Sequence, residues 1–236
     1  GRAAPAVNGE EAGTEEAGIF KVKLHDHTTA HQNTHNNKTN MKRIKTALIS
    51  VFHKDGLDDI IRKLHAEGVT LLSTGGTHDY IVSLGVPCQK VEDLTTYPSI
   101  LGGRVKTLHP KVFGGILARR DEEGDLQQME QYGIPEIDLV IVDLYPFTRT
   151  LASGASTMEI IEKIDIGGIS LIRAAAKNFY DVAVVPSKAQ YPKLAEILET
   201  QGAQTHFDQR TWLAEQAFAI SSQYDQAIHD WIHVNR

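Results

Sequence analysis

The chain has 236 residues, of which 41% are hydrophobic and 23% charged, so it holds enough apolar material for a buried core. Its formal net charge of −6 argues against wholesale binding to nucleic acid or to an anionic membrane surface. The single cysteine, Cys88, excludes an internal disulfide framework and fits a reducing compartment. The sequence shows neither a signal peptide nor an apolar run of the roughly 18 residues that a membrane span needs. We therefore predict a cytoplasmic protein.

The first 40 residues differ in composition from the rest of the chain. They are rich in Ala, Gly and Glu and then almost wholly polar, with no periodic apolar face that a fold could bury. We interpret 1–40 as a disordered N-terminal extension or an artificial tail, and 41–236 as the folded domain. A metal site is the alternative for His25, His27, His31 and His35. However, a sequence rich in Asn and Thr is a poor helix former, and a metal site also needs supporting residues, so we predict no metal site.

From Met41 onward, strand-like apolar runs alternate with helical patterns. The predicted strands are 45–52, 69–73, 137–145 and 181–187. The predicted helices are 57–64, which Gly68 ends, 77–84, which Gly85 ends, 157–164, 190–202 and 211–234. This alternation predicts one α/β domain, with a largely parallel sheet, helices on both faces and a helical elaboration at the C-terminus.

Residues that follow strands are the first candidates for function, because ligands of parallel α/β sheets bind beyond the carboxyl ends of the strands. Ser50 and Lys54 end the first predicted strand. The second strand runs into "STGGT" (73–77), whose glycines allow backbone N–H groups to approach an anion at a helix N-terminus. The hydroxyls of Thr74 and Thr77 are expected to complete a phosphate cradle. A simple tight turn is the alternative interpretation.

A third candidate segment is "GGRVKTLHPKVFGG" (102–115), which has four basic side chains and no carboxylate. An extended run would place Arg104 and Lys106 on one face, and Pro110 disfavours a helix interior for His109. A local basic patch in an acidic chain indicates a small anionic ligand. The alternative is a solvated surface loop.

The fourth segment is "DIGGISLIRAAAKN" (165–178), where Gly167 and Gly168 lie near a predicted helix start. Arg173 and Lys177 are four residues apart and so share one face of that helix. A solvated helix face explains this pair equally well.

Taken together, these segments resemble one family, the IMP cyclohydrolase domain of bifunctional AICAR transformylase/IMP cyclohydrolase. The motifs "LISVFHKDGL", "STGGT", "LGGRVKTLHPKVFGGILARR", "DLYPF" and "IDIGGISLIRAAAKN" occur in that family's order between Thr46 and Trp231. The resemblance implies a methylglyoxal-synthase-like, doubly wound parallel sheet. It also implies an enzyme that closes the purine ring, converting 5-formamidoimidazole-4-carboxamide ribotide (formyl-AICAR ribotide) to IMP and water. This is the last step of de novo purine synthesis, and it would require no cofactor and no metal; a homodimer is expected.

The resemblance also implies roles for individual residues. The expected nucleotide- and phosphate-binding residues are Ser50, Lys54, Thr74, Gly75, Gly76 and Thr77. Those expected around the base and formyl group are Arg104, Lys106, Thr107, Asp143, Leu144, Tyr145, Asp165, Ile166 and Gly167. Among the expected catalytic residues, Lys106 would stabilise the oxyanion and Lys177 would exchange the proton, with Asp165 and Tyr145 as further candidates.

Three positions depart from the family pattern. Phe52 stands where a serine is frequent, Asp143 where an asparagine is frequent, and Phe179 where a histidine is frequent. The bifunctional proteins also carry a larger transformylase domain, which we do not expect here, so the chain is interpreted as an excised domain or a stand-alone cyclohydrolase. Two other functions remain open on the same fold: an effector-binding regulatory module, as in carbamoyl phosphate synthetase, and methylglyoxal synthase.

Overall fold

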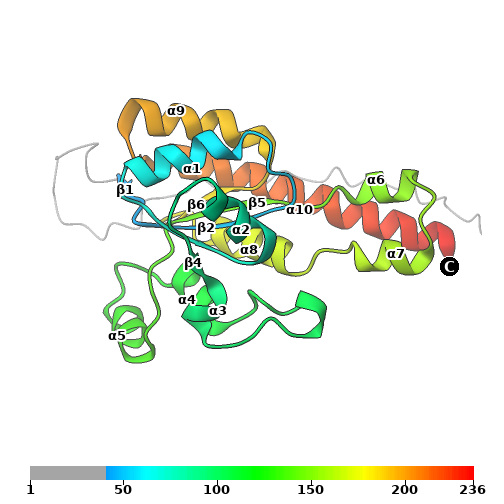
Figure 1. Ribbon diagram of the computed structural model, residues 1–236, viewed down its shortest axis with the longest axis horizontal. Helices are drawn as coiled ribbons and strands as arrows, with labels where there is room; N and C mark the ends of the chain where they lie inside the picture. Colours follow the sequence, from blue (N-terminus) through cyan, green and yellow to red (C-terminus); the bar gives the residue numbers. More distant parts are fainter. Residues whose placement is uncertain (1–40) are drawn as a thin grey trace, which may run out of the picture. The chain divides into compact units, whose positions relative to one another are not determined.

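The computed structural model describes residues 41–236 (Figure 1). The predictions made for 1–40, including the alternative of a metal site at His25, His27, His31 and His35, lie outside the described residues.

A five-stranded sheet forms the centre of the described domain. Its strands are arranged in the order β4 (Gln89–Lys90), β3 (Thr70–Ser73), β2 (Thr46–Val51), β5 (Leu139–Asp143) and β6 (Ala183–Val185). All neighbouring strands are parallel, and in the register Ile49 of β2 lies opposite Ser73 and Ile141. The sheet confirms the predicted α/β fold with a doubly wound parallel arrangement.

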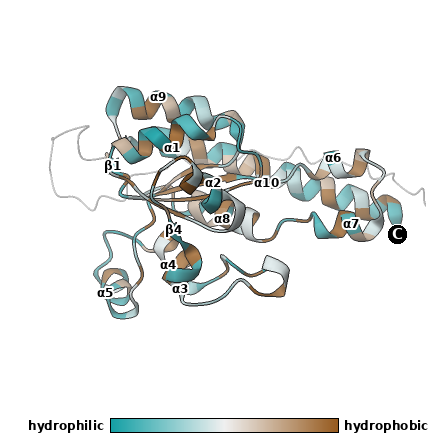
Figure 2. Ribbon diagram, viewed as in Figure 1, coloured by the Kyte–Doolittle hydropathy of each residue, from teal (hydrophilic) through white to brown (hydrophobic). Residues whose placement is uncertain are grey.

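Helices cover both faces of the sheet. Figure 1 shows α1 (Leu57–Ala66) and α9 (Tyr191–Gln201) above the sheet and α8 (Gly167–Lys177) below it. The long helix α10 (Phe207–Asn235) contacts α8 and β6. In Figure 2 the central strands are coloured mainly as hydrophobic, whereas α1 and α9 interleave hydrophilic residues. Because both faces of the sheet are covered, its central strands read as continuous apolar runs rather than alternating ones.

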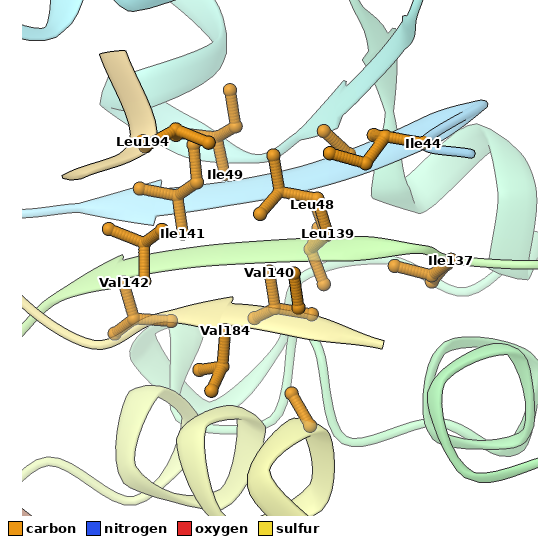
Figure 3. Close-up of a cluster of buried hydrophobic side chains, with 14 of the residues drawn as sticks. Ile44, Leu48, Ile49, Ile137, Leu139, Val140, Ile141, Val142, Val184 and Leu194 are labelled. Carbon is orange, nitrogen blue, oxygen red and sulfur yellow. The ribbon is translucent and has the colours of Figure 1, made fainter. Parts of the chain in front are cut away.

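The core lies between the sheet and these helices. Figure 3 shows Leu48 and Ile49 of β2 beside Val140 and Ile141 of β5, with Leu194 of α9 reaching them from above. Each of these five side chains is at most 1% exposed. A core of this kind fixes the strand ends, and it thereby fixes the loops that leave them.

The remaining elements are short. They comprise α2 (Gly75–Ser83), α3 (Val91–Thr95), η1 (Leu101–Gly103), α4 (Pro110–Leu117), α5 (Glu123–Tyr132), α6 (Phe147–Ala152), α7 (Thr157–Glu162) and η2 (Lys188–Gln190). A separate antiparallel pair joins β1 (Lys42–Arg43) to β7 (Gln204–Thr205). The sequence predicted α2 and α7 but not β1, β4, β7 or α3 to α6. Most of the missed elements have between two and eight residues, which leaves little periodicity for a pattern to show.

The expectation of an extended run through Arg104 and Lys106 is wrong. Gly102 and Gly103 have φ values of 66° and 83°, so the chain turns there instead of extending. Pro110 then begins α4 at a position where its missing N–H costs nothing, and His109 is the N-cap, with its Nδ1 3.1 Å from the amide of Lys111. The prediction that His109 lies outside a helix interior is confirmed.

Candidate functional site

A cavity of about 550 Å³ lies beyond the carboxyl ends of β2 and β5. Three further segments complete its wall: the loop from η1 to α4, the end of α7 and the first turn of α8. The lining residues are Ser50, Val51, Phe52, Gly102, Gly103, Arg104, Lys106, Thr107, Asp143, Tyr145, Ile161, Glu162, Ile164, Asp165, Ile166, Gly167 and Gly168. This is the edge at which ligands of parallel α/β sheets bind.

Most of the predicted site residues meet in this cavity. Those that line it are Ser50, Arg104, Lys106, Thr107, Asp143, Tyr145, Asp165, Ile166 and Gly167. Leu144 lines a smaller neighbouring cavity that shares Asp143 and Tyr145 with the first. The segment 74–77 and Lys54 are not among the lining residues, but contacts described below tie them to Lys106 and to the end of β2.

The amino group of Lys106 lies beside the N-terminus of α2. A Cβ added to Gly75, whose φ is 54°, would be 3.6 Å from Lys106 Nζ. The first amides of a helix have no intrahelical partner and carry positive partial charge. A cationic side chain beside them creates a place where an anion can be held from two sides.

The threonine hydroxyls of "STGGT" do not complete the phosphate cradle that was predicted for them. Thr77 Oγ1 donates to the carbonyl oxygen of Val51 (3.0 Å), and the Val51 amide donates back to it (3.2 Å). Thr74 Oγ1 donates to Glu92 Oε1 at 2.5 Å. Both threonines are buried. Their hydroxyls therefore fix the turn in place, which leaves the backbone amides as the groups of this segment that could bind an anion.

Lys54 provides a second cation near Lys106. Its Nζ donates to the carbonyl oxygens of Val51 (2.8 Å) and Phe52 (3.1 Å), which holds it at the end of β2. Burial lowers the pKa of Lys54; the charge of Asp143 opposes this shift, and that of Lys106 adds to it. Two ammonium groups near each other favour an anion between them.

An acid–imidazole pair at the ends of β2 and β5 was not predicted. Asp143 Oδ2 lies 2.8 Å from His53 Nδ1 and accepts the His53 amide at 3.1 Å. The ring of Phe52 meets those of His53 and Tyr145 edge-on, with centroids 4.8 and 4.3 Å away. The carboxylate that replaces the family's frequent amide therefore has a cationic or hydrogen-bonding partner. The position of His53 directly before Lys54 at a strand end was the signal that could have indicated it.

Asp165 organises the start of α8. Its Oδ1 accepts the amides of Gly168 (2.5 Å) and Ile169 (3.2 Å), and its own amide donates to the Tyr224 hydroxyl at 2.7 Å. A Cβ on Gly168 would lie 2.8 Å from that same oxygen, so the close approach requires glycine. The carboxylate thus sits at a helix N-terminus, which stabilises its charge, on the wall of the cavity.

Lys177 does not reach this cavity within one chain. It lies at the far end of α8, ten residues after Gly167, which corresponds to about 15 Å along the helix axis. Its side chain is exposed, as is that of Arg173, whose guanidinium lies 5.7 Å from the centroid of the Phe218 ring. The predicted proton-exchanging residue and the predicted oxyanion stabiliser are therefore apart in the single chain.

The fold and the site define a class: an α/β domain with a cavity lined by Arg104 and Lys106 at the carboxyl edge of its sheet. Comparison with known families makes the class specific. Residues 56–170 match the MGS-like domain, and residues 175–236 match the AICARFT/IMPCHase bienzyme family. The chain belongs to this family and corresponds to the IMP cyclohydrolase domain of PurH, as the sequence motifs predicted.

Individual relatives agree with this assignment. The chain is 68% identical over 190 residues to the bifunctional purine biosynthesis protein PurH of Bacteroides thetaiotaomicron, covering 80% of this chain and 38% of that protein. It is 48% identical over 191 residues to PurH of Corynebacterium glutamicum (strain R), covering 81% and 36%. The crystal structure of ForH superposes with a TM-score of 0.66 at 36% identity, covering 79% of this chain and 97% of that one. The chain thus spans little more than a third of the length of these curated relatives.

Proposed function

We propose that this chain is an IMP cyclohydrolase that closes the purine ring of formyl-AICAR ribotide. In this reaction the carboxamide nitrogen attacks the formyl carbon of the same molecule. The formyl oxygen becomes an oxyanion, takes up two protons, one lost by the carboxamide nitrogen and one by the formamido nitrogen, and leaves as water while a carbon–nitrogen double bond forms to give IMP. The single observation that carries the proposal is the position of Lys106 on the cavity wall, with its Nζ beside the N-terminus of α2.

The cavity supplies what an intramolecular ring closure needs. Because both reacting groups belong to one molecule, holding the substrate in a folded conformation removes much of the entropic barrier. The amides of Gly75 and Gly76, with Lys54, would hold the 5′-phosphate at one side. Lys106 would face the developing oxyanion, where one well-placed donor is worth about 3 kcal/mol.

We assign proton transfer to side chains on the wall of the cavity opposite Lys106. Asp165 and Tyr145 line the cavity and can exchange protons with the carboxamide and the leaving oxygen. A role for Lys177 requires a second copy of the chain, because its own cavity lies about 15 Å away along α8. We therefore propose that the expected homodimer brings Lys177 of one copy to the cavity of the other.

The closest rival is a regulatory module that binds a nucleotide without converting it. The match of 175–236 to the bienzyme family favours the cyclohydrolase over both this module and methylglyoxal synthase, since a shared fold alone does not fix function. The cations that line the cavity do not by themselves distinguish the cyclohydrolase from these two alternatives.

The test is to add formyl-AICAR ribotide to the purified chain and follow IMP by ultraviolet absorbance. We expect IMP to form faster than in a protein-free control, which measures spontaneous ring closure. Binding of IMP without any acceleration would instead support the regulatory module.

A further inference from the structure

An ion pair joins two walls of the cavity. Arg104 follows η1, Glu162 ends α7, and both line the cavity. The Nη2 of Arg104 donates to Glu162 Oε1. The cation that was predicted to bind the substrate is therefore already engaged by a carboxylate from the opposite side.

This pair can exchange partners at low cost. The side chains of Arg104 and Glu162 are 63% and 54% exposed, and ion pairs in water contribute little stability. The purine base of the nucleotide presents O6 and N7 side by side, and a guanidinium can donate to both through two parallel hydrogen bonds. A nucleotide in the cavity therefore competes with Glu162 for Arg104.

Glu162 has no other role in the described chain that would explain its position. The capping box of α7 uses Ser156 and Glu159 instead. No ion pair joins the neighbouring Lys106 to any carboxylate between residues 41 and 236. Of the two cations that line the cavity, Arg104 and Lys106, only Arg104 is paired with a described carboxylate, that of Glu162.

The backbone before Arg104 is turned and lies outside the core. Leu101, Gly102 and Gly103 follow one another with φ values of 53°, 66° and 83°. For Leu101 this conformation is unfavourable, and its side chain is 70% exposed, so burial does not anchor it. Arg104 can therefore change partner without disturbing the core.

We propose that Glu162 sets the affinity of this cavity for its nucleotide by competing for Arg104. Glu162 holds Arg104, and the base of the nucleotide displaces this carboxylate when it binds. This inference rests on the proposed function in one respect only, namely that the cavity takes an anionic nucleotide.

The experiment measures the Kd of IMP by calorimetry for the full chain and four variants: Glu162→Gln, Glu215→Gln, Arg104→Gln and the double variant Arg104→Gln/Glu162→Gln. Glu162→Gln removes the competing charge and should lower the Kd about two- to five-fold, the range that an exposed ion pair can supply. Glu215→Gln removes the same charge from an exposed position of α10 outside the cavity and should leave the Kd unchanged. Adding Glu162→Gln to Arg104→Gln should give no gain, because the contested partner is gone.

Each result has a separate meaning. An unchanged Kd in Glu162→Gln, with binding intact in the parent chain, overturns the proposal. The same conclusion follows if the gain persists in the Arg104→Gln background, since Glu162 would then act as a general repulsive charge. If the parent chain does not bind IMP at all, the proposed function itself fails, and this inference fails with it. Thermal melting of every variant confirms that it is folded.

Discussion

At the scale of single residues, the strand ends of this chain collect cations around one cavity in a protein that is acidic as a whole. Lys106 is the cation whose surroundings are the most informative. Its amino group stands beside the unpaired amides of α2, and no described carboxylate pairs with it. Two sources of positive charge that face one space repel each other until an anion arrives. An anionic group between them would relieve this repulsion.

We predict that Lys106→Ala lowers kcat for ring closure by about 10²- to 10³-fold, the effect of removing one oxyanion donor. The melting temperature should hardly change, because Lys106 is half-buried and makes no ion pair in the described chain. Lys111→Ala is the matched control, since Lys111 lies in the same basic segment but outside the cavity wall. A kcat within a few-fold of the parent would show that Lys106 does not face the oxyanion.

The pair of His53 and Asp143 leads to a second prediction. His53→Ala should raise the KM for the nucleotide roughly ten-fold, because an unpaired carboxylate at the cavity wall repels an anionic substrate. His53→Gln, which can still donate to Asp143, should have a smaller effect. Adding Asp143→Asn to His53→Ala removes the unpaired charge and should recover most of the lost affinity. Steady-state kinetics measures all three variants, and a KM that the second substitution fails to improve would contradict this explanation.

The sequence was sufficient to place Ser50, Lys106 and Asp165 at one site, because the motifs that carry them resemble the site of one family. It was not sufficient to assign the hydroxyls of "STGGT". Whether a threonine faces a ligand or the protein's own groups depends on hydrogen bonds to other elements, here β2 and α3, and these exist only after the chain has folded. His53 was missed for the same reason, since its partner lies ninety residues away in the sequence.

At the scale of elements, long apolar runs such as β5 were predictable, whereas the way in which α10 is attached was not. The predicted helix began at Thr211, but α10 begins at Phe207, where the His206 amide donates to Gln209 Oε1 at 2.8 Å. This earlier start places Arg210 inside the helix and in the core, where it is 1% exposed. Sequence patterns treat an arginine as a solvated residue, because a buried one requires several partners from distant segments.

Arg210 joins α10 to two other segments. It donates to the carbonyl oxygens of Phe179 (3.0 Å), Tyr180 (3.0 Å) and Thr205 (2.6 Å). We predict that Arg210→Leu lowers the free energy of unfolding by about 3 kcal/mol or more, because several buried carbonyls lose their donor. Arg149→Leu, at an exposed position of α6, should cost less than about 0.5 kcal/mol. Urea denaturation measures both changes, and equal stability of the two variants would contradict a structural role for Arg210.

At the scale of the whole molecule, the distance between Lys177 and the cavity raises the question of whether one chain suffices. The exposed end of α8 carries Arg173 and Lys177, and beside it α10 exposes Phe218 and Trp212, which are 41% and 40% accessible. Large exposed apolar side chains next to cations are typical of interfaces between proteins. In a two-fold dimer the same patch of each copy meets the other, so one contact delivers a residue in both directions.

If Lys177 of one copy serves the cavity of the other, two inactive variants should repair each other. Lys106→Ala and Lys177→Ala are each expected to lose most activity as pure samples. When they are refolded together, half of the dimers are mixed, and each mixed dimer contains one cavity with both lysines intact. We therefore predict recovery of about a quarter of the parent activity.

The control mixes Lys106→Ala with Lys54→Ala, whose side chain lies near Lys106 at the end of β2 of the same chain. In that mixture each cavity inherits one defect, so activity should stay low. Failure of the first mixture, with dimers shown by sedimentation, would confine Lys177 to its own chain and leave proton transfer to Asp165, Tyr145 or water.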